Sequence, residues 1–144
     1  MTSESTNVRP PNCLILGPRT VEFTALIVSL RNVLARMGVE LITLDRQVEY
    51  GGLVSDAALQ IPRTIENADA VIVDLTGANP NVMYELGFAH ALKKPVLPIV
   101  SRRDPDIPSD LQGYLYYAYD ESDPFDLSQT VDRWLRRTLG ERLP

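Results

Sequence analysis

The chain has 144 residues, of which 44% are hydrophobic and 23% charged, and it carries a formal net charge of −5. This length and composition are typical of one globular domain. The acidic balance argues against a nucleic-acid partner, because the chain offers no basic patch that could displace counterions from a phosphate backbone. Its densest basic group, Arg133, Arg136 and Arg137, is expected on the solvated face of a terminal helix.

Disulfide-bonded and membrane proteins are also disfavoured. The single cysteine, Cys13, cannot form an intrachain disulfide, which fits a reducing compartment, and its apolar neighbours predict a small core residue. No apolar run approaches the roughly 20 residues that cross a bilayer. The first 12 residues lack the pattern of a signal peptide. We therefore expect a cytoplasmic protein without a membrane partner.

The predicted elements alternate along the chain. Residues 1–11 are polar, end in two prolines and are expected to form a disordered tail before a single domain over residues 12–144. Short apolar runs predict strands at 13–16, 39–44, 70–74, 95–100 and 114–119. Apolar spacings of three and four predict helices at 21–37, 55–67, 80–93 and 126–139, with Pro62 expected to kink or split the second.

This alternation predicts a three-layer α/β fold. We expect a flavodoxin-like sheet of five mostly parallel strands with helices on both faces. In such folds small molecules bind at the carboxyl ends of the strands, near helix N-termini.

Several common sites are not indicated. The chain has no P-loop, and the turn at residues 16–20 has one glycine where a dinucleotide fingerprint needs three. His90 is the only histidine, and no acidic cluster has metal-ligand spacing. We therefore expect neither a metal ion nor a resident cofactor.

The segment from Asp74 to Glu85 is the candidate site. Asp74 ends a predicted strand, where it either serves a ligand or caps a turn through Thr76 or Gly77. Glu85 lies one turn inside the next helix at the border of its buried stripe. The alternative for Glu85 is a surface glutamate stabilised by the helix dipole.

The start of that helix contributes two amide side chains. Asn79 before Pro80 fits an N-cap followed by a proline at the first helical position. Asn81 and Glu85 are four residues apart and share a face. Gly87 inside the same helix indicates close approach of another backbone or of a ligand.

The run ADAVIVDLTGANPNVMYELGFAHALKKPV at residues 68–96 resembles nucleoside 2-deoxyribosyltransferase-like proteins, and most closely their bacterial TIR-like, predicted nucleotide-binding branch. A weaker likeness covers about 100 residues. The resemblance implies that Glu85 is the nucleophile on the anomeric carbon and that Asp74 binds and protonates the base. TIR-domain NAD glycohydrolases also place a catalytic glutamate at a position comparable to Glu85. A carboxylate there would stabilise or trap an oxocarbenium-like state.

The chain departs from that pattern at three places, one of which is Pro62, where relatives carry an uninterrupted helix. Deoxyribosyltransferases carry a further aspartate shortly before the glutamate, where this chain has Asn79. Their aromatic and acidic residues after the first strand are replaced by a turn from Gly17 through Arg19, and Arg19 could contact a phosphate. The predicted substrate-binding residues are Gly17, Arg19, Thr76, Asn79 and Asn81.

Three hypotheses follow from these residues. The first is an N-glycosidase or deoxyribosyltransferase-like enzyme acting on a nucleoside, nucleotide or NAD-type dinucleotide. The second is a module that senses a nucleotide without turning it over, and the third is a TIR-like protein–protein interaction domain. The oligomeric state is open, with a homo-oligomer as one alternative. The enzymatic hypothesis requires the carboxyl groups of Asp74 and Glu85 to open into a shared hollow.

Overall fold

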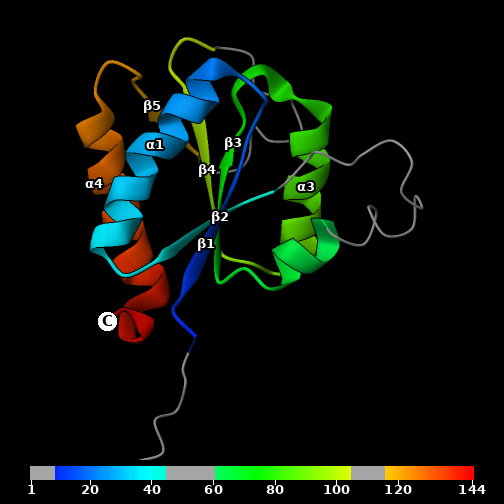
Figure 1. Cartoon of the computed structure of the whole chain (residues 1–144). Coiled ribbons are helices and arrows are strands. Elements are labelled where there is room, and N and C mark those ends of the chain that lie inside the picture. Colours follow the sequence, from blue (N-terminus) through cyan, green and yellow to red (C-terminus); the bar gives the residue numbers. More distant parts are fainter. Residues whose placement is uncertain (1–8, 45–60, 105–115) are drawn as a thin grey trace, which may run out of the picture.

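The structure, a computed structural model, describes residues 9–44, 61–104 and 116–144, and its centre is a five-stranded sheet of order β2-β1-β3-β4-β5 (Figure 1). The strands are β1 (Asn12–Leu16), β2 (Glu40–Thr43), β3 (Ala70–Asp74), β4 (Val96–Ser101) and β5 (Tyr117–Tyr119). Each neighbouring pair is parallel, which confirms the predicted flavodoxin-like sheet. The chain moves from β1 to β2 on one side and to β3 on the other, so the topological switch point lies between β1 and β3.

Helices cover both faces of the sheet. The first face is covered by α1 (Val21–Arg36) and α4 (Pro124–Leu139), and the second by α3 (Pro80–Ala91) and the helical residues 61–66 (Figure 1). Alternate strand residues point to opposite faces, so Ile72 packs with α1 and α4 whereas Val71 and Val73 pack with α3. One apolar cluster lies between the sheet and the helices on each face, which confirms the three predicted layers. No helix among the described residues is long and apolar enough to cross a membrane.

The helix boundaries follow from local chemistry. Helix α1 ends where Gly38 adopts a φ of +70°, as its sequence position predicts. Helix α4 begins at Pro124, two residues before the predicted start. The reason is that Asp123 caps it by accepting a hydrogen bond from the Asp126 backbone N–H, while Pro124 occupies the first helical position.

Two predicted strands are shorter than expected. Strand β2 covers Glu40–Thr43 of the predicted 39–44. Strand β5 begins at Tyr117, so Tyr116 lies outside it, and residues 114 and 115 are not described. The predicted start of the second helix at residues 55–60 and positions 1–8 of the predicted tail also lie outside the described residues. Within the described part of the tail, Arg9 donates to the carboxylate of Asp69 at 3.3 Å.

Pro98 lies in β4 between two neighbouring strands, a position that normally excludes proline because its nitrogen carries no hydrogen. The Pro95 carbonyl accepts the backbone N–H of Val71 in β3, and the Ile99 carbonyl accepts that of Leu75 just after β3. The alternate residue Pro98 therefore directs its nitrogen toward the β5 side. Pairing with β5 begins only at Ile99. The missing N–H therefore falls just before the β4–β5 pairing starts and breaks no bond between these strands.

Candidate functional site

Asp74 is a buried carboxylate at the carboxyl end of β3, and only 2% of the residue is exposed. Its Oδ1 accepts hydrogen bonds from the Thr76 backbone N–H at 3.1 Å and the Thr76 hydroxyl at 2.6 Å. Its Oδ2 accepts a hydrogen bond from the Tyr119 hydroxyl at 2.9 Å. Asp74 therefore caps the turn after β3 and also connects that turn to β5.

The environment of Asp74 favours its protonated form. Burial raises the pKa of Asp74 above its usual value, and hydrogen bonds from Thr76 and Tyr119 offset part of that rise. Burial also raises the pKa of Tyr119, so its phenol stays protonated and donates to the carboxylate. The Thr76 hydroxyl accepts the Ser101 backbone N–H at 2.9 Å, which holds the end of β4 in the same network.

Tyr119 is the residue at this edge whose role the sequence did not reveal. It ends the last strand and is 45 residues from Asp74 in the chain, so no local spacing relates the two. The available signal was a tyrosine at the carboxyl end of a predicted strand, where side chains of parallel strands gather at one edge.

The turn between β3 and α3 is organised by its own side chains. The Asn79 Oδ1 accepts the backbone N–H of Asn81 at 2.9 Å and of Val82 at 3.4 Å. This confirms Asn79 as the N-cap and Pro80 as the first helical residue. The Gly77 backbone N–H donates to Asp104, which follows β4. The amide side chain of Asn79 thus already has a structural role.

Glu85 is also buried, with 2% of the residue exposed, so it is not a surface glutamate. It shares the buried face of α3 with Val82, Leu86 and Ala89. A carboxylate among apolar neighbours is placed at a large energetic cost unless it is paired or protonated. Gly87 on the opposite face is exposed, and no described atom lies within 4 Å of a Cβ built there, so close approach of a described backbone does not explain this glycine.

The two acids lie on different faces of the sheet. Asp74 continues the alternation of Ala70 and Ile72 and bonds to Tyr119, which places its side chain on the face covered by α1 and α4. Glu85 belongs to α3, which covers the other face. The shared hollow between them stays a prediction.

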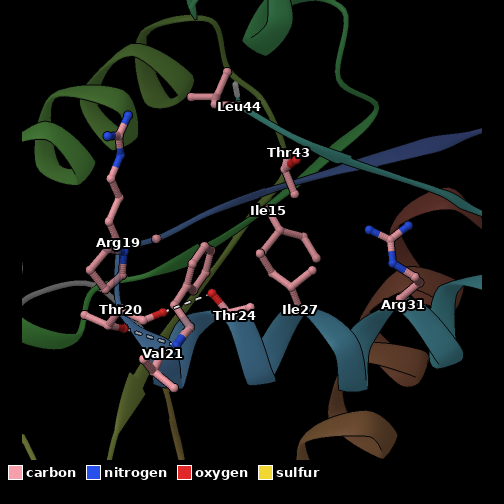
Figure 2. A pocket seen from close by; sticks show the side chains of 12 residues that line it. Ile15, Arg19, Thr20, Val21, Thr24, Ile27, Arg31, Thr43 and Leu44 are labelled. Carbon is pink, nitrogen blue, oxygen red and sulfur yellow. Dashed lines mark hydrogen bonds between the residues drawn. The ribbon is translucent and has the colours of Figure 1, made fainter. Parts of the chain in front are cut away.

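A large hollow does open beside this edge, and it contains two of the predicted residues. Its volume is about 610 Å³, and Gly17 and Arg19 line it at the end of β1 (Figure 2). Leu16 pairs with Val73, so the turn at Gly17 begins beside Asp74. The remaining walls come from β1 and the turn after it, from α1 and from the end of β2: Ile15, Pro18, Thr20, Val21, Phe23, Thr24, Ile27, Arg31, Thr43 and Leu44. Asp74 and Glu85 are not among these lining residues.

Gly17 is required by the packing of this hollow. A Cβ built at Gly17 would lie 2.1 Å from the Phe23 ring, which is far inside contact distance. The ring of Phe23 therefore packs directly on the backbone of the turn. Thr20 begins α1 by accepting the Phe23 backbone N–H at 3.1 Å, which fixes the ring at the mouth of the hollow. No role was predicted for Phe23 or Arg31. In the sequence Phe23 resembles an ordinary apolar residue of the helix, and Arg31 resembles an ordinary solvated one.

Across the described residues, histidine, cysteine, aspartate and glutamate do not form a group of three that could hold a metal ion. The buried thiol of Cys13 has its pKa raised by burial, so it is no nucleophile at neutral pH.

No protein-family model and no curated protein sequence matches the chain. Solved structures do. A TIR domain of a Toll-related receptor from Hydra magnipapillata has a TM-score of 0.63 at 20% identity, covering 86% of this chain and 97% of its own. A CMP N-glycosidase from Clostridium botulinum has a TM-score of 0.61 at 16% identity, covering 84% and 98%. A 2-deoxyribosyltransferase from Bacillus psychrosaccharolyticus has a TM-score of 0.59 at 18% identity, covering 78% and 88%.

These likenesses concern the fold, because all three identities are low. They agree with the resemblance carried by residues 68–96. The chain therefore has the fold shared by nucleoside 2-deoxyribosyltransferases, the CMP N-glycosidase and TIR domains.

Proposed function

We propose that the protein cleaves the N-glycosidic bond of a nucleoside, nucleotide or NAD-type substrate, as a hydrolase or a transferase. The observation that carries this proposal is the burial of Glu85 on α3, at the helix that follows the edge where Asp74 ends β3. Two buried carboxylates, one ending β3 and one in the helix that follows it, are residue types suited to glycosidic chemistry. The fold likeness to an N-glycosidase and a deoxyribosyltransferase supports the same reaction class.

In the proposed reaction Glu85 attacks or stabilises C1′ of the sugar as the bond from C1′ to the base nitrogen breaks. The electron pair of that bond moves to the base, which takes a proton from Asp74. Burial raises the pKa of Asp74 and so favours the proton-bearing form that an acid needs. Water then adds to C1′ in hydrolysis, or a second base adds in transfer. Where Glu85 has formed a bond to C1′, that bond breaks in this step and the Glu85 carboxylate leaves. The Asp74 carboxylate takes the proton of the incoming group, which restores the acid.

The remaining predicted residues would bind rather than react. Thr76, Asn79 and Asn81 lie around the turn between β3 and α3, near the sugar. Gly17 and Arg19 line the hollow, where the guanidinium can bind a phosphate. The partner is thus a small molecule. A cytoplasmic location and a homo-oligomer remain predictions.

The test is to incubate the protein with a panel of nucleosides, 5′-nucleotides and NAD and to measure the free base released by chromatography. We expect Glu85→Gln to lower the rate by a factor on the order of 100 or more, because the amide cannot attack C1′ or balance positive charge on the sugar. Glu141→Gln is the matched control, since Glu141 is exposed beyond α4. Unchanged base release by Glu85→Gln would reject the assigned role.

A second candidate is a module that binds a nucleotide without cleaving it. It is favoured by Asp74, whose two oxygens already accept three hydrogen bonds from Thr76 and Tyr119. A carboxylate used in this way holds the edge of the sheet together. A ligand that raises the melting temperature yet is recovered intact after long incubation would support this candidate over the enzyme.

A further inference from the structure

The hollow beside α1 has an arginine at each end, with apolar and hydroxyl side chains between them. Figure 2 shows Arg19 at one end, Arg31 at the other, and Ile15 and Ile27 between them. The Phe23 ring, which packs on the turn at Gly17, adds an aromatic surface toward the Arg19 end. Residues 20 and 31 are separated by about 16 Å along the helix axis, at 1.5 Å per residue. The hollow is therefore suited to a ligand that is longer than a nucleoside.

The residues that line the hollow carry positive charge, whereas the chain as a whole is negatively charged. The chain has a net charge of −5, yet the twelve residues that line the hollow include two arginines and no aspartate or glutamate. A concave surface with one sign of charge concentrates ligands of the opposite sign. Guanidinium groups fit phosphate oxygens with paired donors.

The two arginines lie at different distances from the edge where Asp74 lies. Arg19 follows Gly17, and the turn at Gly17 begins beside Asp74. Arg31 lies three turns along α1, at the far end of the hollow. A single phosphate on the sugar would reach the first arginine. A second phosphate extends the ligand along the hollow toward the other.

We propose that Arg31 is a specificity-determining residue that binds a phosphate remote from the reacting bond, so that the preferred ligand is a nucleotide carrying more than one phosphate. The placement of the reacting bond at the carboxyl edge rests on the proposed function. Arg19 binds the phosphate nearer the sugar.

Calorimetric titration tests the role of Arg31. The protein used is the Glu85→Gln variant, which is expected to leave the ligand intact. It is titrated with adenosine, AMP and ADP, and separately with cytidine, CMP and CDP. In the series that binds, the diphosphate should bind about tenfold more tightly than the monophosphate, and the nucleoside most weakly. Arg31→Gln should abolish the advantage of the diphosphate and leave the affinity for the monophosphate unchanged. Arg19→Gln should weaken both nucleotides.

Arg36→Gln is the matched control, because Arg36 lies on the same helix outside this hollow and should leave every affinity unchanged. Equal binding of mono- and diphosphate, no binding of any probe, or an Arg31→Gln variant that behaves like the parent would overturn the inference. An Arg31-dependent preference without base release from any substrate would refute the proposed function alone. Base release from neutral nucleosides at rates that Arg31→Gln does not alter would refute this inference alone.

Discussion

At the scale of single residues, Asp74 and Asp69 are two partly or fully buried aspartates with opposite electrostatic surroundings. Burial raises the pKa of Asp74. The net effect at Asp69 is a lowered pKa, although desolvation opposes it, because the carboxylate accepts the Asn12 backbone N–H at 2.9 Å and the Arg142 guanidinium at 2.8 Å. The native state therefore holds a proton more tightly than the unfolded state at one aspartate and less tightly at the other.

This difference predicts opposite pH dependence of stability. The contribution of Asp74 is fully present below its unfolded pKa of 3.8 and is lost as the pH rises through the higher native value. The free energy of unfolding of the parent, minus that of Asp74→Asn, should therefore fall as the pH rises above about 4. For Asp69→Asn the same difference should fall as the pH drops below about 4. Urea denaturation between pH 3 and 7 measures both, and a difference for Asp74→Asn that grows with pH would contradict the assignment.

At the scale of elements, two helices begin in the same way, with an asparagine or aspartate as the N-cap and a proline after it. Asn79 and Pro80 begin α3, as Asp123 and Pro124 begin α4, and each cap side chain accepts a backbone N–H of the first turn. The capping oxygen satisfies a donor that has no partner inside the helix, and the proline replaces a donor that would have none. The N-cap of α3 also fixes the turn that carries the candidate sugar-binding residues.

Asn79→Ala should lower the free energy of unfolding by about 1 kcal/mol, because the backbone N–H groups of Asn81 and Val82 lose their acceptor. Asn79→Asp is the matched variant, since it keeps the acceptor and adds a favourable charge at the helix N-terminus. Chemical denaturation at pH 7 distinguishes them. Equal destabilisation by both substitutions would show that the cap oxygen is not the stabilising group.

At the scale of the whole molecule, the local parts of the structure could be predicted and the long-range parts could not. Strand β3 was predicted with its observed bounds, because a buried parallel strand is a continuous apolar run that needs no knowledge of its neighbours. The bond between Tyr119 and Asp74 depends on strand order, which brings together residues 45 positions apart. Helix spacing placed Glu85 at the border of a buried stripe, but the burial of Asp74 and the face of the sheet on which each side chain lies follow from the assembled sheet.

The hollow illustrates the same limit. Its walls come from β1, α1 and the end of β2, and Arg31 looks like any solvated helix residue until those elements are packed. The local signals at Gly17 and Arg19 placed them correctly at the end of the first strand, because the turn is short and follows an apolar run. The later start of β5 had no such signal, since the tyrosines at positions 116 and 117 are equally suited to a strand.

The proline of β4 also bears on how the folded protein behaves in concentrated solution. Before Ile99, the side of β4 that faces β5 is unpaired among the described strands, and such a row of backbone groups is a template for a strand from another copy. Pro98 withdraws one donor from that row, so an incoming strand cannot complete a continuous ladder. Pro98→Val should therefore leave the sheet intact but promote self-association. Light scattering at rising protein concentration would detect it, and a variant that stays monodisperse would show that this proline does not guard the edge against ordered aggregation.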